Sequence, residues 1–399
     1  MSRLVFAVIL ASLALSPHLA AAAAAAAPPD GFASVNMVDL LWSYAGLTAG
    51  NASYARAAMR AACSDRGFTF IRFAASPFWA ADLKRVYLAN SSGFFALSDA
   101  LVADAAAAGC GLMPSLFWDL FTFADAFGEP AGVVFDEQLG PSAARDAMEA
   151  FAVAYATRYA TSSAVVAFEL GNENNLLWDL NQTQQQNSIC VPCGSPPFRT
   201  SADNISTAAG VAVQARLASL VAAAVSAAGG GARPISSGHA MARPDATWLR
   251  DNFRVASPPP LQFDTLEEFL AITAQQQRGV SLLSQHIYAG SDNERFGITD
   301  PMSPAVLVYA RQAAAAAGQT LLVGEFGDGE PGNRTFTRNV LALLASWRGS
   351  SGGAPFFGLV WAFELLQQAA SFSLFPGRDD DILAAIVAHN NGGAASAAL

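Results

Sequence analysis

The stretch 165–174, with the sequence VVAFELGNEN, joins an apolar, β-branched start to a run of carboxylate and amide side chains. The apolar start predicts a buried strand. Because strand side chains alternate between two faces, Glu169, Gly171 and Glu173 are predicted to share one face. A buried strand that ends in charged residues indicates a working surface, which makes Glu173 a candidate catalytic acid. The alternative is an acidic helix N-terminus or polar turn.

A helix that ends in glycine, a short apolar strand and a polar loop recur eight times along the chain. Parallel strands joined by helices follow from this order, and eight units predict a single-domain (β/α)8 TIM barrel of the α/β class. A doubly wound open sheet is the alternative, but nothing here resembles its glycine-rich phosphate turn. Strands are predicted at 32–37, 68–73, 111–116, 165–170, 234–237, 280–285, 320–324 and 354–360, and helices at 51–64, 98–108, 141–160, 201–228, 264–277, 304–317, 335–347 and 379–388.

Composition narrows the class of protein. The chain has 399 residues, a normal length for one such barrel with long loops, and 53% of them are hydrophobic, enough for a large core. The net charge of −10 argues against binding to nucleic acid or to anionic membranes. A monomer is expected. The long segments 177–203 and 240–263 both follow strands, where barrel loops line the active face.

The N-terminus has the order of a secretory signal. Residues 1–27 comprise a basic start, an apolar stretch at 4–15 that is too short to span a bilayer comfortably, and an alanine run. We therefore predict a signal peptide at 1–27, a catalytic domain at 28–390 and a flexible tail at 391–399; a signal anchor is the alternative. The expected location is extracellular or in the cell wall. Five glycosylation sequons support export, at Asn51, Asn90, Asn181, Asn204 and Asn333.

The four cysteines form an even set, as an oxidising compartment favours. Cys190 and Cys193 are predicted to form a local disulfide in a long polar loop. A zinc site is disfavoured because a lone CxxC lacks a second pair of ligands. Cys63 and Cys110 are predicted to bridge a helix to a neighbouring strand start.

Polar and aromatic side chains gather where the predicted strands end, whereas the strand interiors are predicted to be apolar. In a barrel these ends converge on one mouth. The residues concerned, in strand order from the second to the eighth, are Arg72, Trp118, Asp119, Asn172, Glu173, His239, His286, Tyr288, Glu325, Trp361 and Glu364.

Glu325, in the stretch LLVGEFG at 321–327, is the candidate second carboxylate, across the mouth from Glu173. Two carboxylates that flank a glycosidic bond are the minimum for its acid-assisted hydrolysis. We expect Arg72 to keep Glu325 ionised as nucleophile, and a partly desolvated Glu173 to serve as acid and then base. Asn172 is expected to donate to the sugar 2-hydroxyl, and Tyr288 to orient Glu325. Alternatively, the glutamates merely pair with Arg72 and the histidines.

Tryptophan rings suit stacking on the apolar faces of sugars, and Trp361 is the main candidate platform. Each ring could instead belong to the core, as is expected of Trp248 and Trp347 on helices. The tryptophans that follow predicted strands are Trp42, Trp79, Trp118, Trp178 and Trp361.

These residues resemble glycoside hydrolase family 5, in the clan with catalytic glutamates on strands four and seven. Asn172-Glu173 is similar to its acid/base motif, and Glu325 in VGEFG is similar to its nucleophile. The resemblance implies an enzyme that binds a polysaccharide and needs neither metal nor cofactor. Arg72, His286, Tyr288 and Trp361 match its supporting residues. The predicted substrate-binding residues are Arg72, Asn172, Trp118, His286, Tyr288 and Trp361.

The resemblance is nearest to the endo-β-mannanase branch. Cellulases of the family usually place a histidine at the end of strand three, where residues 115–119 are SLFWD, and FELGNE at 168–173 also favours the mannanase branch. That branch usually follows its acid with proline, whereas here Asn174 follows. The implied function is a secreted retaining endo-β-glycanase acting on β-1,4-linked mannan or glucomannan. A cellulase, a β-glucanase, a β-glucuronidase-like enzyme and a non-catalytic carbohydrate-binding barrel are the alternatives.

Overall fold

The structure is a computed structural model that describes residues 30–185, 189–330, 333–348 and 353–392. The predicted signal peptide and the tail beyond residue 392 lie outside the described residues.

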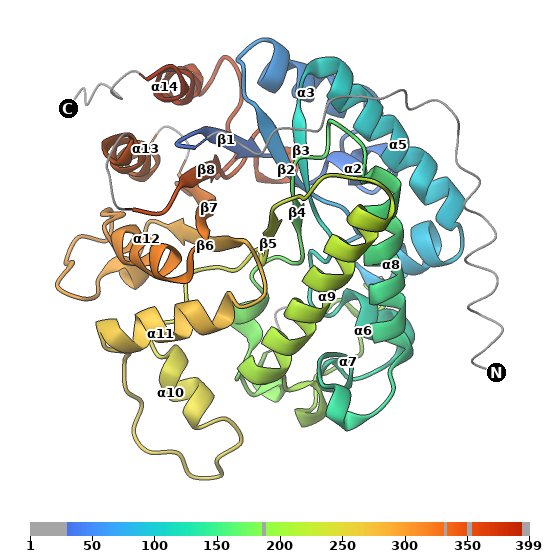
Figure 1. The fold of residues 1–399 in the computed structure, drawn as a ribbon, viewed down its shortest axis with the longest axis vertical. Coiled ribbons are helices and arrows are strands. Elements are labelled where there is room, and N and C mark those ends of the chain that lie inside the picture. The colour runs from blue at the N-terminus through green and yellow to red at the C-terminus, as the bar shows by residue number, and fades with distance from the viewer. Residues whose placement is uncertain (1–29, 186–188, 331–332, 349–352, 393–399) are drawn as a thin grey trace.

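Eight parallel strands close into a barrel in chain order (Figure 1). The closure is made by β1, which pairs with both β2 and β8. The predicted (β/α)8 fold is therefore confirmed. The strands are β1 (Ala33–Asn36), β2 (Phe70–Ala74), β3 (Gly111–Ser115), β4 (Phe168–Glu169), β5 (Ile235–Ser236), β6 (Leu282–Tyr288), β7 (Thr320–Gly327) and β8 (Phe356–Val360).

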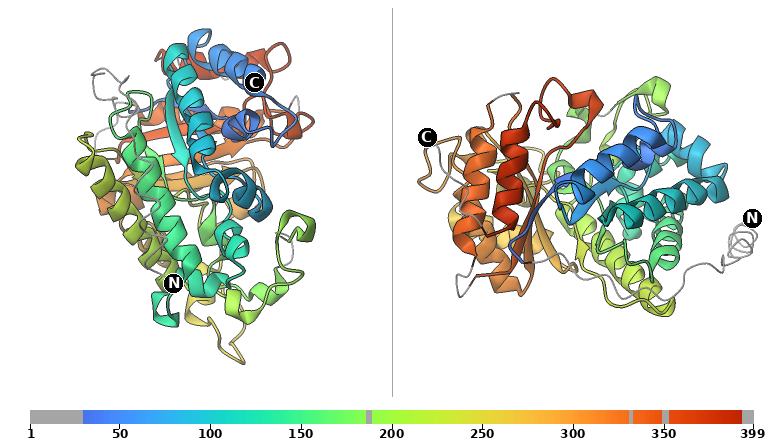
Figure 2. Two further views of the ribbon diagram at one scale, coloured as in Figure 1. Left: turned by 90° about the vertical axis from the view of Figure 1, so that its right-hand side faces the viewer. Right: turned by 90° about the horizontal axis from the view of Figure 1, so that it is seen from above.

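The longer helices surround the strands, as both views of Figure 2 show. Several begin at side-chain caps; Thr265 and Glu268, for example, form a reciprocal capping box. The outer helices are α3 (Ala52–Met59), α5 (Ser91–Ala108), α8 (Ala143–Tyr159), α9 (Thr207–Ala227), α11 (Leu266–Gln276), α12 (Val306–Ala317), α13 (Thr335–Trp347) and α14 (Asp380–Asn390). The shorter helices are α2 (Leu40–Tyr44), α4 (Ala80–Asp82), α6 (Thr122–Phe127), α7 (Ala131–Phe135) and α10 (Ala246–Asp251).

Some predicted boundaries were wrong. The fourth strand is only two residues long, and Val165 makes an isolated bridge to Leu112. Strands β6 and β7 run further than predicted, so that His286, Tyr288 and Glu325 stand on strands and not after them. Helix α5 begins at Ser91 and not at residue 98, because Asn90 caps it there.

The barrel interior has two layers. An apolar layer includes Phe70, Met113, Leu322 and Phe357, which form a cluster separate from the larger core. The strands also bury polar side chains, so the prediction of apolar strand interiors was wrong. Most of these groups bond to one another and to the backbone, which offsets the cost of burial, whereas Ser284 Oγ, Gln285 Oε1 and His286 Nε2 have no hydrogen-bond partner among the described residues. They are Ser34, Asn36, Arg72, Ser115, Glu169, Ser236, Ser284, Gln285, His286 and Glu325.

One described helix, α9, is long and apolar enough to cross a membrane by length and composition alone. It packs beside α8 in the outer ring (Figure 1). Since 44% of its apolar window is buried inside the molecule, it is accounted for as a helix that covers the barrel.

Both predicted disulfides are confirmed. Cys63 is bonded to Cys110, and Cys190 is bonded to Cys193. The first joins the segment after α3 to the residue before β3, and the second lies in the long loop after β4.

Replacement of Cys63 and Cys110 with alanine is expected to lower the free energy of unfolding by on the order of 4 kcal/mol, because the bond cross-links residues 47 positions apart. The matched control replaces Cys190 and Cys193, which are 3 positions apart and constrain the unfolded chain far less. Urea unfolding of the oxidised proteins provides the measurement. Equal losses in the two double variants would contradict the prediction.

The sequons differ in accessibility. Asn204 is buried, and its side-chain oxygen accepts a hydrogen bond from the backbone N–H of Gln182 at 2.9 Å. A glycan at Asn204 therefore does not fit the folded structure. The exposed sequon asparagines are Asn51, Asn90, Asn181 and Asn333.

Candidate active site

Glu173 leaves the strand through a sharp turn. After β4 the chain stays beside β5, since the N–H of Leu170 donates to Ser236 O at 2.9 Å and the N–H of Glu173 donates to Gly238 O at 2.8 Å. Glu173 has a φ of 53°, in the left-handed region. The prediction that Glu169, Gly171 and Glu173 share one extended face was therefore wrong. Glu169 points into the barrel, and the Glu173 side chain is 32% exposed at the mouth.

Gly238 makes this close approach possible. Its φ is 73°, and a Cβ atom at this position would lie 1.8 Å from the carbonyl oxygen of Gly171. Any other residue would push apart the segments that carry Glu173 and His239.

Arg72, on β2, is completely buried and joins four strands or strand ends. Its Nε donates to Glu169 at 2.6 Å, and its Nη1 donates to Glu325 at 2.6 Å and to Asn36 at 3.0 Å. Its Nη2 donates to the side-chain oxygen of Asn172 at 2.8 Å, which leaves the amide NH2 of Asn172 as the donor of that side chain. The guanidinium fork thus sets the positions of one candidate catalytic carboxylate and of its neighbours.

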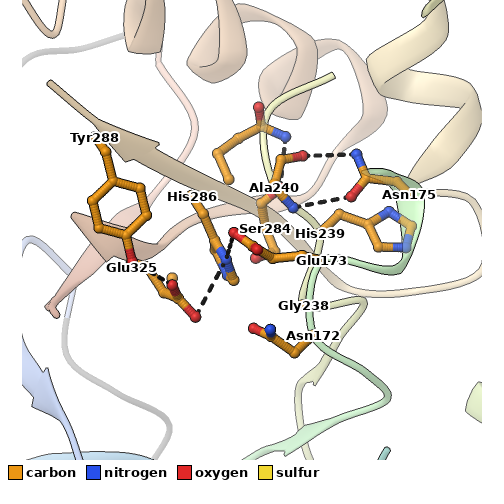
Figure 3. Close-up of polar contacts among 12 residues, drawn as sticks. Asn172, Glu173, Asn175, Gly238, His239, Ala240, Ser284, His286, Tyr288 and Glu325 are labelled. Atoms are coloured by element: carbon orange, nitrogen blue, oxygen red, sulfur yellow. Dashed lines mark hydrogen bonds and ion pairs between the residues drawn. The ribbon is translucent and has the colours of Figure 1, made fainter. Parts of the chain in front are cut away.

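The two candidate glutamates approach each other across the mouth (Figure 3). His286 Nδ1 lies 3.0 Å from Glu173 Oε1 and 3.4 Å from Glu325 Oε1. One oxygen of each carboxylate and this nitrogen all lie within 4.8 Å of one another. The other oxygen of Glu325 accepts a hydrogen bond from the Tyr288 hydroxyl at 2.5 Å. The structure therefore brings together Glu173, Glu325, Arg72, His286 and Tyr288, as the sequence predicted.

The same three ligand atoms have the spacing of a cation site. Glu325, however, already accepts hydrogen bonds from Arg72 on one oxygen and from Tyr288 on the other. A cation would have to compete with a guanidinium for that carboxylate, so the donor set favours proton chemistry over metal binding.

Burial dominates the protonation of the site. It raises the pKa of Glu173, against smaller opposing effects of Arg72 and Arg243. Burial also raises the pKa of Glu325, and this effect exceeds the opposing effects of His286 and Arg72. Arg72 acts in the predicted direction, whereas desolvation of the carboxyl group opposes it. Burial lowers the pKa of His286 to about 4 and raises the pKa of Tyr288 well above its ordinary value.

An aromatic cluster lies beside the carboxylates. Trp118 and Trp361 stack with ring centroids 5.9 Å apart and an interplanar angle of 19°. The guanidinium carbon of Arg72 lies 4.6 Å from the Trp118 ring centroid. Since the two indoles are only 7% and 9% exposed, each covers much of the other, and only a small part of either is open to a sugar.

The other tryptophans have different surroundings. Trp178 belongs to the core and packs against Gly210 of α9, so it is not the platform that its position after a strand predicted. Trp42 and Trp79 are half-buried next to Phe78. Trp347 is buried as expected, whereas Trp248 is only half-buried.

Three predicted strand-end residues have other structural surroundings. His239 is buried with its ring edge-on to Trp178, at 4.8 Å between centroids. Asp119 accepts a hydrogen bond from the N–H of Phe121, and burial raises its pKa to about 6. The backbone carbonyl of Glu364 accepts from the Tyr54 hydroxyl at 2.9 Å.

Sequence reasoning missed Asn36 and Arg243, and it did not pair Glu169 with Arg72. Asn36 accepts from Arg72 and donates to Gly324 O at 3.0 Å. Arg243 donates twice to the carbonyl oxygen of Leu176, at 3.0 and 2.6 Å, and its charge lowers the pKa of Glu173. The signal for Glu169 was available, because a charged residue in a buried strand needs a partner and Arg72 occupies another buried strand.

No family model matches the sequence, and no curated protein matches it. Solved structures do match over most of the chain. The endo-1,4-β-mannanase of Rhizomucor miehei has a TM-score of 0.58 at 13% identity, over 91% of this chain and 95% of that one. The endo-β-1,4-mannanase of Thermotoga petrophila has a TM-score of 0.57 at 12% identity, over 90% of this chain and 77% of that one. The endoglucanase Cel5A of Pseudomonas stutzeri has a TM-score of 0.52 at 13% identity, over 91% of this chain and 96% of that one.

A glycoside hydrolase family 5 mannosidase from Rhizomucor miehei is similar to the same degree, with a TM-score of 0.57 at 10% identity over 90% of this chain and 92% of that one. The resemblance read from the strand ends is thereby confirmed at the level of the fold. This chain has the barrel fold of glycoside hydrolase family 5 structures, with mannanases among its structural neighbours.

Proposed function

We propose that this chain is a secreted, retaining endo-β-glycanase of family 5 that hydrolyses β-1,4-linked mannan or glucomannan. The observation that carries the proposal is the approach of Glu173 and Glu325, whose nearest oxygens lie within 4.8 Å in a site that also holds Arg72, His286 and Tyr288. Retaining enzymes place their carboxyl groups about 5–5.5 Å apart, whereas inverting enzymes need about 6.5–9.5 Å. The spacing here favours retention.

In the first step, a carboxylate oxygen of Glu325 attacks the anomeric carbon while Glu173 transfers its proton to the departing glycosidic oxygen. Arg72 and Tyr288 hold the nucleophile through one hydrogen bond to each of its oxygens. The ester to Glu325 is the glycosyl-enzyme intermediate. In the second step, Glu173 removes a proton from water, the water oxygen bonds to the anomeric carbon, and the bond to Glu325 breaks. Two displacements retain the anomeric configuration.

The choice of mannan is supported by the mannanases among the similar folds and by the stretch FELGNE. A cellulase is the second candidate, because the endoglucanase has nearly the same coverage. Two disulfides and the predicted leader support secretion to the cell exterior or wall. The acidic chain is proposed to act as a monomer on its polysaccharide, without nucleic acid or membrane partners.

Reducing-sugar release from mannan, glucomannan, cellulose and laminarin tests the proposal. We expect release from mannan or glucomannan, with oligosaccharides as the first products and retained configuration by proton NMR. Preferential release from cellulose would favour the cellulase. A lack of hydrolysis of all four polymers would overturn the proposed function.

The pH profile of kcat/KM is expected to be a bell displaced upward from the ordinary glutamate pKa of 4.5. Glu173 must be protonated to act as acid; its raised pKa means that activity is lost only as the pH rises above that raised value. Glu325 must be ionised, and its raised pKa means that activity is lost as the pH falls through a higher value than usual. The two apparent pKa values belong to the pair, because the groups interact. A bell centred at or below the ordinary glutamate value would contradict this prediction.

A further inference from the structure

A small cavity lies next to the segment that carries Glu173, since Leu170 and Asn174 of that segment line it. It has a volume of about 20 Å³ and is lined by the segments after β3, β4 and β5 and by α7, α8 and α9. Most of its wall is apolar, but Asn174, Trp178 and His239 also line it. Asn174 follows Glu173 directly, and His239 follows the glycine that accepts the Glu173 N–H.

Each of these three residues has a buried polar atom without a protein partner. The atoms are the Asn174 side-chain oxygen, Trp178 Nε1 and His239 Nδ1. Other polar groups of the wall are satisfied; Gln214, for example, donates to Gln276 O and Arg278 O, both at 3.0 Å. A buried polar group that lacks a hydrogen bond costs roughly 1–3 kcal/mol, so three around one cavity point to a missing bonding partner.

The three atoms have the donor and acceptor character that a single water molecule satisfies. The indole N–H of Trp178 only donates, and the side-chain oxygen of Asn174 only accepts. His239 Nδ1 accepts when the proton of the ring is on Nε2. Burial lowers the pKa of His239 to about 3, so the ring is neutral and one of its nitrogens is free to accept. A buried water typically makes about three hydrogen bonds and needs roughly 10–15 Å³.

We propose that this cavity binds one ordered water, which accepts from Trp178 and donates to Asn174 and His239, and that the bridge positions the acid Glu173. Trp178 and His239 are then positioning residues, acting through the water and not on the sugar. The role in catalysis rests on the proposed function, whereas the binding of the water does not.

The surroundings explain why such a bridge is needed. Glu173 has a left-handed backbone, which must be held by its neighbours. Beyond it, the side chain of Asn175 donates to Ala240 O at 2.9 Å and accepts from Ala240 N at 3.1 Å (Figure 3). Bonds therefore tie the two segments together at Glu173 and at Asn175. The water would supply the missing connection at the residues between, Asn174 and His239.

A crystal structure of the mature chain tests the water directly. We expect a density peak within hydrogen-bonding distance of the Asn174 oxygen, Trp178 Nε1 and His239 Nδ1. An empty cavity, or three side chains that bond to other protein groups, would overturn the proposal. This crystallographic test does not depend on activity, so it remains valid even if the proposed function is wrong.

Kinetics of Trp178→Phe test the positioning role. This variant removes the N–H donor and keeps an aromatic ring. For a manno-oligosaccharide, whose leaving group needs a proton, we expect kcat/KM to fall by about 10- to 100-fold, as for a misplaced general acid. For a dinitrophenyl glycoside, whose leaving group needs no proton, formation of the glycosyl-enzyme should stay close to the wild-type rate.

Two further variants separate positioning from folding. Trp347→Phe, on α13, removes an indole that is also buried. It should leave unchanged the ratio of the rate on the manno-oligosaccharide to the rate on the dinitrophenyl glycoside. His239→Gln keeps a polar side chain that can accept a hydrogen bond from the water. Its ratio of the rate on the manno-oligosaccharide to the rate on the dinitrophenyl glycoside should stay close to the wild-type ratio. Equal losses on both substrates in Trp178→Phe, or the same change of ratio in Trp347→Phe, would overturn the positioning role. A wild-type chain that cleaves neither substrate would instead count against the proposed function.

Discussion

Replacement of Glu325 with alanine is expected to reduce kcat on β-1,4-mannan by about four to six orders of magnitude, as removal of a catalytic nucleophile does elsewhere. The carboxylate oxygen that is proposed to form the intermediate is absent, while the proposed acid Glu173 and its neighbour His286 remain in place. The shortened side chain leaves room on that face of the sugar. A small anion such as azide or formate should therefore restore cleavage and form a product of inverted configuration.

Initial rates with and without the anion provide the measurement, with product configuration read by NMR. Glu330→Ala is the matched control, since Glu330 is an exposed glutamate in the loop after β7 and should keep the wild-type rate. A wild-type rate in Glu325→Ala would show that the nucleophile is another group. Rescue with retained configuration would exclude direct attack by the anion.

Replacement of Arg72 with methionine is the second large effect that we expect. The change leaves Glu169 and Glu325 buried without their cation, since the side chains of these glutamates are 0% and 5% exposed. Loss of one partner from a buried ion pair costs about 3–5 kcal/mol, because the remaining charge stays desolvated. The activity should fall as well, because one oxygen of the nucleophile loses its hydrogen bond.

A second substitution separates the two losses. Adding Glu169→Gln removes one uncompensated charge and should recover part of the free energy of unfolding, but none of the activity. Arg216→Met is the control, since the contacts of Arg216 with Glu137 and Glu149 lie at the surface and should matter little. Urea unfolding and initial rates give the two readouts. If the single and double variants were equally stable, the buried charge on Glu169 would not be the cause of the loss.

The barrel was predictable because the signals for its helices and strands lie in short, continuous stretches of the sequence. Glycine ended α5 and α12 where expected, and α13 begins and ends at the predicted residues. The encounter of Glu173 with Glu325 was predictable from the fold, since the C-terminal ends of strands four and seven open at the same mouth of a closed ring. The short helices in the loops were not predictable, because packing against neighbours decides them.

Other errors came from interactions between distant segments. Glu169 was counted with the mouth because a period of two was assumed to continue through Glu173, whereas the bond from Glu173 to Gly238 bends the chain there. Trp178 resembled a sugar platform by its place after a strand. Its burial depends on the small residue Gly210, thirty-odd positions later on α9, and a local pattern does not reveal such a contact.

The proposed reacting groups and the long segments after β4 and β5 have separate origins in this fold. Arg72, His286, Tyr288 and Glu325 stand on strands, whereas the described parts of the long segments after β4 and β5 have their own anchors, such as the buried pair of Arg199 with Asp125. If the proposed function holds, lengthening or exchanging these segments should therefore direct the activity to other polymers while the chemical step stays unchanged. A barrel of this design is a convenient recipient for transplanted specificity.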